Sequence, residues 1–173
     1  MIITGVGSRN LPTRVEKIIV EYGSLYAKEH DLRTGDAVGS DHAFTMAWKN
    51  SRSKRIFVSE INRVRDEYHV LGNEFQFEKA KLLVESLRPH VKRLDEYARR
   101  LHYRNAFQVL GLNLDTPSDV LVCYAEPKNS IHVKGGTNTA VQIAKMYNIP
   151  VYNLYYEEDI KKFIKMRIFG LCF

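Results

Sequence analysis

Cysteine is scarce in this chain of 173 residues, which holds only Cys123 and Cys172. Two cysteines without a Cys-x-x-Cys motif or a Cys/His cluster argue against a disulfide scaffold and a metal site, and we expect both thiols to be inert. Long apolar runs are also missing, since none approaches the roughly 20 residues needed to span a bilayer. The first ten residues lack the basic and apolar regions of an export signal. We therefore expect a cytoplasmic protein that has no contact with a membrane.

The composition is otherwise that of an ordinary globular protein, with 45% hydrophobic and 27% charged residues. The length suits a single domain spanning residues 1–173. The formal net charge is +6, and it is unevenly distributed. The stretch 88–104 has acidic groups only at Asp95 and Glu96, against six basic ones: Arg88, Lys92, Arg93, Arg99, Arg100 and Arg104. An anionic partner is therefore expected near this stretch.

Strand and helix patterns alternate along most of the chain, which predicts an α/β fold with a mostly parallel sheet. From about residue 59 to 101 the alternation breaks and no strand pattern is found, so we expect a helical insertion packed against the sheet. The expected strands are 1–6, 32–34, 54–58, 119–124 and 150–154. The expected helices run from 12 to about 30, across 43–48, over 74–87, from about 91 onward, across 140–147, and from 157 to about 166.

Three glycine-bearing turns follow expected strands: Gly-Val-Gly-Ser-Arg at 5–9, Gly-Asp-Ala-Val-Gly-Ser-Asp at 35–41, and Gly-Gly-Thr-Asn-Thr at 135–139. In a parallel sheet such turns gather at the carboxyl ends of the strands, where helix N-termini offer N–H groups to an anion. Glycine lets the backbone approach a phosphate closely. No turn is a Gly-x-Gly-x-x-Gly fingerprint or a Walker A loop. The turns together predict a phosphate-bearing ligand, and no cofactor is expected.

The segment His-Tyr-Arg-Asn-Ala-Phe-Gln-Val-Leu-Gly at 102–111 places Arg104 and Asn105 at the end of the basic stretch. A guanidinium offers a bidentate fork and an amide both donates and accepts hydrogen bonds, so this pair could clamp a phosphate or a base edge.

Taken together, Gly-Ser-Arg at 7–9, TGDAVGSDHAF at 34–44, RNAFQVLG at 104–111, SDVLVCYAEP at 118–127, KGGTNTAVQIA at 134–144 and IPVYNL at 149–154 resemble the SLOG superfamily. The likeness is greatest to DNA-processing proteins of the DprA (Smf) type and to small DprA-like proteins of phages and prophages. It covers roughly residues 1–58 and 102–154. The resemblance implies a Rossmann-like three-layer sandwich, a bacterial cell or phage-infected host, and a homo-oligomer.

The resemblance also implies that a nucleotide, or single-stranded DNA, binds across the strand ends. Asp36 departs from the family pattern, which has a small residue there, and its carboxylate would repel a phosphate or bind a ribose hydroxyl. The ligand-binding residues implied by position are Gly7, Ser8, Arg9, Gly35, Asp36, Gly39, Ser40, Asp41, Arg104, Asn105, Gly135, Gly136, Thr137 and Thr139.

Catalysis would be hydrolysis of a nucleotide N-glycosidic bond, which needs a carboxylate beside an oxocarbenium-like centre. Glu126 is the carboxylate best placed by sequence, although a solvated loop glutamate is the simpler interpretation; Asp36 and Asp41 are alternatives. His102 and His132 could act as acid or base. The third turn lacks the glutamate that the phosphoribohydrolases of the superfamily carry. A nucleotide-binding protein without assigned turnover is thus the first hypothesis.

The second hypothesis is a DprA-like module for DNA processing or recombination, in which Arg93, Arg100 and Arg104 follow a single strand. The tyrosines that could stack on a base are Tyr97, Tyr103, Tyr124, Tyr155 and Tyr156.

Overall fold

The computed structural model describes residues 1–166, and Cys172 lies outside this range. The chain forms an α/β fold with one six-stranded, all-parallel sheet in the order β4-β3-β2-β1-β5-β6. The strands are β1 (Ile2–Gly7), β2 (Asp31–Gly35), β3 (Lys54–Val58), β4 (His69–Leu71), β5 (Val120–Tyr124) and β6 (Val151–Asn153). The helices are α1 (Thr13–Tyr26), α2 (Ser40–Ala47), α3 (Glu74–Leu87), α4 (Glu96–Leu110), α5 (Thr137–Met146) and α6 (Glu157–Lys165), with short 3₁₀ turns η1 (Ile61–Arg63) and η2 (Pro89–Arg93).

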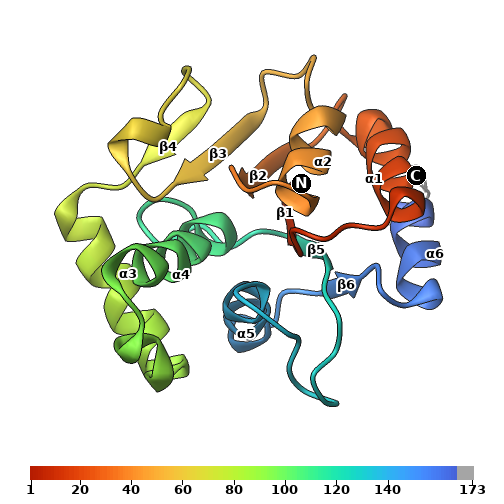
Figure 1. Cartoon of the computed structure of the whole chain (residues 1–173). Helices are drawn as coiled ribbons and strands as arrows, with labels where there is room; N and C mark the ends of the chain where they lie inside the picture. Colours follow the sequence, from red (N-terminus) through yellow and green to blue (C-terminus); the bar gives the residue numbers. More distant parts are fainter. Residues whose placement is uncertain (167–173) are drawn as a thin grey trace.

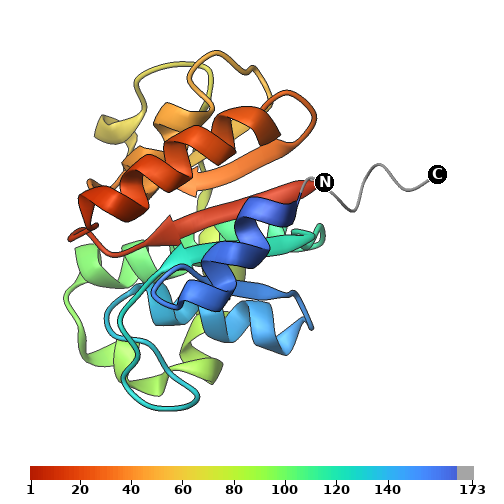
Figure 2. The same cartoon turned by 90° about the vertical axis from the view of Figure 1, so that its right-hand side faces the viewer.

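Helices cover both faces of the sheet, which gives the α/β fold that the alternating pattern predicted and the Rossmann-like three-layer sandwich that the resemblance implied. In Figure 1 the sheet runs diagonally between α1, α2 and α6 on one side and α3, α4 and α5 on the other. Figure 2 shows α1 and α6 lying side by side on their face of the sheet. Each face has its own apolar core, built on one side around Ile19, Phe44 and Phe163 and on the other around Phe107 and Ile143.

The central strands are apolar on both faces because helices bury both, as expected for a parallel sheet. Ile3 of β1 and Leu121 and Val122 of β5 are completely buried. The two strands run in register from Ile3 beside Val120 to Gly7 beside Tyr124. They therefore end together, and the loops that follow them start at neighbouring points.

The stretch 59–101 was expected to contain no strand, and this expectation was wrong. His69–Leu71 forms β4, which pairs in parallel with Ile56–Val58 of β3 at the edge of the sheet. The strand is only three residues long and its own sequence has no alternation, so the pairing with β3 defines it. The helix expected from about Val91 begins later, because η2 occupies 89–93 and Asp95 caps α4 by accepting a hydrogen bond from Ala98 N.

Helix α4 lies on this face, and several of its residues line a cleft at the carboxyl edge of the sheet. The limit expected for the insertion, residue 101, lies within this helix, which continues to Leu110. Its second half is buried against the sheet, and Arg104 and Gln108 are buried with it. Within residues 1–166, no helix has the length and apolar character needed to cross a membrane.

Candidate functional site: a cleft at the carboxyl edge of the sheet

A cleft of about 510 Å³ opens where β1 and β5 end. The chain leaves β1 toward β2 on one side, whereas β5 pairs with β1 on the other side. Ligands of open parallel sheets bind at such a reversal of strand order, outside the carboxyl ends of the strands. The cleft is lined by the turn after β1, one face of α4, the loop after β5 and the first turn of α5.

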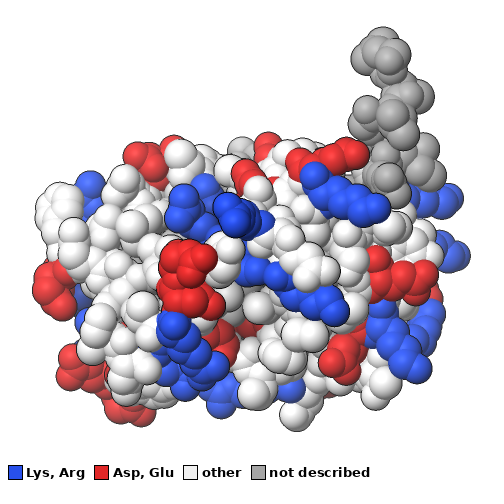
Figure 3. Space-filling model, turned by 90° about the horizontal axis from the view of Figure 1, so that it is seen from above, with Lys and Arg blue, Asp and Glu red and all other residues white. Residues whose placement is uncertain are grey.

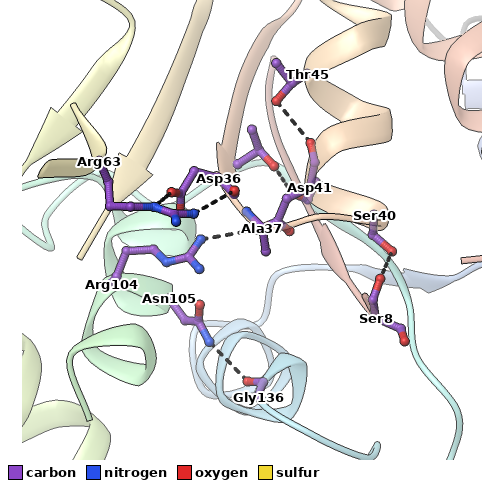
Figure 4. A network of polar contacts seen from close by, with 12 residues as sticks. Ser8, Asp36, Ala37, Ser40, Asp41, Thr45, Arg63, Arg104, Asn105 and Gly136 are labelled. Atoms are coloured by element: carbon purple, nitrogen blue, oxygen red, sulfur yellow. Dashed lines mark hydrogen bonds and ion pairs between the residues drawn. The ribbon is translucent and has the colours of Figure 1, made fainter. Parts of the chain in front are cut away.

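The first and second glycine turns are packed against each other. Ser40 donates from both its backbone N and its hydroxyl to the carbonyl of Ser8, each at 3.0 Å, and Figure 4 shows the two serines facing one another. Gly39 has a φ of +79°, and a Cβ there would lie 2.5 Å from Ser8 O. Gly7 is equally confined, since its Cβ would lie 2.6 Å from Tyr124 O. Gly39 and Ser40 therefore support the first turn and do not line the cleft themselves.

A buried ion pair joins the second turn to α4. Arg104 Nη1 donates to Asp41 Oδ2 at 3.2 Å, and both side chains are only 6% exposed (Figure 4). Burial raises the pKa of Asp41, while the Arg104 cation and the Ala37 N–H oppose that shift. Gly35 leaves room for the pair, because a Cβ there would lie 1.4 Å from Arg104 Nη1. Asp41 and Arg104 both line the cleft.

Arg104 is fixed by its neighbours, but not all of its hydrogen-bond donors have a partner within residues 1–166. Its Nε is buried and has no hydrogen-bond partner within residues 1–166. With its amide nitrogen facing Asn105, Gln108 accepts from Arg104 Nη1 at 2.9 Å and from Gly35 N at 2.7 Å, and donates to Asn105 Oδ1. Asn105 Nδ2 in turn donates to Gly136 O at 3.1 Å. A row of polar side chains on α4 thus connects the second turn to the third.

The third turn is the most open of the three. Gly135 has a φ of +73°, and a Cβ at this position would meet no atom within 4 Å. Helix α5 starts after Gly136 without a side-chain cap. Gly135, Gly136 and Thr137 line the cleft, whereas Thr139 is fully buried behind them. The two glycines before α5 therefore leave their backbone uncovered by a side chain of their own at the cavity.

Two cationic side chains lie at the rim. Arg9 lines the cleft, is exposed, and has no ion-pair partner in the described part of the chain. Lys134 also lines it, and its Nζ is 2.6 Å from Glu126 Oε1. Both side chains of that pair are more than half exposed, so the ion pair contributes little to stability. Glu126, the expected catalytic carboxylate, is at the cleft but is paired with a lysine.

Asp36 forms an ion pair through its carboxylate with a residue outside the glycine turns. Its carboxylate accepts a hydrogen bond from Arg63 Nε, and its side chain is 8% exposed (Figure 4). Asp36 does not line the cleft. Arg63 belongs to η1 in the stretch without a recognisable motif, which is why the sequence did not indicate this partner. The carboxylate is thus not among the groups of the cleft that could repel a phosphate or bind a ribose hydroxyl.

The basic residues assigned to a DNA path are dispersed. Arg93 is exposed on η2, while Arg100 donates to Ser59 O at 2.9 Å and lies 4.0 Å over the Phe77 ring. Arg104 is buried with Asp41. Acidic and basic side chains are interspersed on the face in Figure 3.

None of the five tyrosines proposed to stack on a base is among the cleft residues in the described range 1–166. Tyr103 is buried, donates to Glu85 Oε1 at 2.7 Å, and has its pKa raised by burial to about 12.

The cleft also contains side chains that the turn motifs did not indicate. Ala98, Leu101, His102 and Asn105 follow a three- or four-residue spacing on α4 and form one wall. His102 had been considered only as an acid or base, and the spacing along this helix is the signal that could have placed it in the wall. His132, the other candidate acid or base, lies in the loop before α5, and its Nδ1 is 3.3 Å from Nδ2 of Asn138 on that helix. Across residues 1–166, no three His, Cys, Asp or Glu side chains are grouped to hold a metal ion.

Comparisons of the chain with protein-family models, curated proteins and solved structures give no match. The class of protein is therefore defined by its fold and site alone: a Rossmann-like α/β fold with a cleft at the reversal point of a parallel sheet.

Proposed function

We propose that the protein binds a nucleotide or a nucleotide-derived small molecule, with the phosphate held between the first and third glycine turns. The observation that carries this proposal is that Gly7–Arg9 and Gly135–Thr137 line the same cleft at the reversal of strand order. The uncapped start of α5 provides N–H groups and the positive end of a helix dipole.

The charges of the cleft suit a small anion. Asp41 is neutralised by Arg104, and Glu126 is paired with Lys134, so Arg9 provides the net positive charge. Lys134 is bound only by an exposed ion pair, which a phosphate can replace at little cost. The cleft thus offers Arg9 as an unpaired cation and Lys134 as a second cation that can exchange Glu126 for a ligand. This limited positive charge favours a monophosphate over a highly charged polyphosphate.

The rest of the cleft fits a nucleoside. A volume of about 510 Å³ lies within the usual range for small-molecule sites. Ala98 and Leu101 form an apolar part of the α4 wall, against which a flat base can pack, and Asn105 lies further along the same wall. An amide both donates and accepts, which is what reading a base edge requires.

The buried Arg104 also supports a binding role. A buried N–H without a partner costs about 1–3 kcal/mol, and native proteins contain few of them. Such a cost at Arg104 Nε, beside a cleft, is typical of a site shaped for a ligand rather than for stability.

The test is calorimetric titration with the four ribonucleoside 5′-monophosphates, inorganic phosphate and the corresponding nucleosides. Wild type should bind at least one monophosphate more tightly than its nucleoside, and Arg9→Ala should weaken that binding by tenfold or more. Arg52→Ala is the matched control, because Arg52 is exposed and precedes β3, at the opposite edge of the sheet. No binding of any monophosphate, or equal losses in both variants, would refute the proposal.

The DNA-binding hypothesis is examined with the same variants. The basic stretch is largely engaged within the protein, since Arg88 donates to Thr139, Lys92 pairs with Glu85, and Arg104 pairs with Asp41. We therefore expect a single-stranded oligonucleotide to bind weakly. Tight binding that falls steeply with salt and is lost in Arg93→Ala would favour the DNA function instead.

A further inference from the structure

Behind the first turn of α5, three side chains from different elements form a hydrogen-bonded chain. Arg88 comes from the end of α3, Thr139 from α5, and His102 from α4. Arg88 Nη1 donates to Thr139 Oγ1 at 3.0 Å, and Thr139 Oγ1 lies 2.7 Å from His102 Nδ1. His102 is the member of this chain that lines the cleft.

The direction of the second hydrogen bond follows from the hydroxyl. Thr139 is completely buried, and its oxygen already accepts from Arg88. The hydroxyl proton needs an acceptor, and within residues 1–166 the one found for it is His102 Nδ1. If Nδ1 carried a proton instead, the hydroxyl would be left with a buried, unsatisfied donor. Nδ1 therefore accepts, and the imidazole proton is on Nε2.

The surroundings also keep this imidazole neutral. Burial, together with electrostatic interactions with Arg88, His90 and Arg104, lowers the pKa of His102 to about 4. Near pH 7 the ring is therefore neutral and donates from Nε2, because the Thr139 hydroxyl at Nδ1 fixes its tautomer. Nε2 itself has no hydrogen-bond partner within the described residues 1–166.

The ring lies beside the backbone that is proposed to hold phosphate. A Cβ on Gly136 would be 3.9 Å from His102 Cε1, the ring atom bonded to Nε2. A ligand oxygen at the start of α5 is thus within reach of the Nε2–H group.

We propose that His102 is a specificity-determining residue, which donates from Nε2 to a phosphate oxygen at the start of α5, and that Arg88 and Thr139 are positioning residues that fix its tautomer. This inference rests on the proposed phosphate site and extends it to a ligand group that must accept a hydrogen bond. The ligand class is a phosphate monoester or diester, and a group that can only donate is rejected because it would face the N–H.

The tautomer is tested without a ligand, by nitrogen NMR of the ¹⁵N-histidine-labelled protein at pH 7. Wild type should show His102 protonated at Nε2 alone. Thr139→Val removes the hydroxyl while keeping the side-chain shape, and it should give a mixture of the two tautomers. A wild-type ring protonated at Nδ1, or a tautomer unchanged in Thr139→Val, would overturn the assignment.

Binding is tested with the monophosphate that wild type binds best and with inorganic phosphate. His102→Ala should weaken both by about tenfold or more, the loss expected for one hydrogen bond to a charged group. His102→Gln should restore most of the affinity, since its amide supplies a donor near the position of Nε2. His42→Ala, an exposed change on α2, is the control and should leave affinity unaltered.

The outcomes separate the two proposals. If wild type binds and Arg9→Ala weakens binding while His102→Ala does not, the role of His102 is refuted and the phosphate site stands. If His102→Gln is as weak as His102→Ala, the donor role is also refuted. If wild type binds no phosphate compound, both proposals fail.

Discussion

Gly35→Ala should destabilise the protein strongly, although it adds a single methyl group. The new Cβ would lie 1.4 Å from Arg104 Nη1 and 2.4 Å from Asp41 Oδ2. Ordinary contact begins near 3.4 Å, so Nη1 would have to retreat by about 2 Å. A retreat of that size breaks the 3.2 Å ion pair between two buried side chains.

The magnitude can be worked out from this pair. Breaking a buried ion pair costs about 3–5 kcal/mol, because a charge is left without a partner. Replacing glycine by alanine in a strand recovers about 0.5–1 kcal/mol of backbone entropy. The free energy of unfolding should therefore fall by about 2–4.5 kcal/mol, which corresponds to a drop in Tm of roughly 4–18 °C for a chain of this size.

The assay is urea denaturation followed by circular dichroism, combined with a double-mutant cycle on Arg104→Ala. In the Arg104→Ala background the guanidinium is gone and the Asp41 carboxylate can turn aside, so Gly35→Ala should cost at least about 2 kcal/mol less than in wild type. Gly136→Ala is the control, since its methyl meets only His102 Cε1 at 3.9 Å, and it should change stability by less than about 1 kcal/mol. Additive effects of Gly35→Ala and Arg104→Ala would refute the reasoning.

Three further outcomes are expected. Gly136→Asp should stabilise α5 by about 0.3–1 kcal/mol through its dipole yet weaken monophosphate binding far more than Gly136→Ala, as measured by melting and titration; equal affinities would contradict an anion site there. His102 takes up a proton near pH 6.5 when unfolded and near 4 when folded, so the unfolded state binds more protons between these values and stability should fall as pH drops through this range. His102→Gln should flatten that part of the stability curve, and an unchanged curve would argue against a neutral, buried ring. Burial raises the pKa of Cys123 to about 12, so mass spectrometry should find this thiol alkylated by iodoacetamide only after unfolding, and rapid labelling of the folded protein would contradict its burial.

Local signals in the sequence predict some elements of this fold to the residue. Helix α3 has the expected bounds, because Asn73 and Gln76 form a capping box at its start and Pro89 follows its end. Strand β3 also matches, since Lys54–Val58 ends in three buried apolar residues. Where a residue's own neighbours in the chain determine the element, the sequence is sufficient.

The missed features depend on partners distant in the chain. Strand β4 exists because β3 offers it an edge, and nothing within His69–Leu71 indicates this. The pairing of Asp36 with Arg63 joins a turn to η1 across 27 positions, and it engages a carboxylate that the family resemblance assigned to the ligand. The start of α4 is a different case, because the sequence does contain its signal. Asp95 is a residue type that caps helices, but the apolar spacing from Val91 favoured an earlier start.

The pairing of β1 with β5 has a consequence for synthesis on the ribosome. Ile2 N donates to Asp119 Oδ2, a partner 117 positions later in the chain. At about 5–20 residues per second, β1 waits roughly 6–23 s for the strand that covers its second edge. For most of that interval the nascent chain has the first turn but not α4 (Glu96–Leu110), and α5 (Thr137–Met146) is made only after β5. The proposed ligand would therefore stabilise only the complete fold, and until β5 is made the second edge of β1 stays open to pairing with other chains.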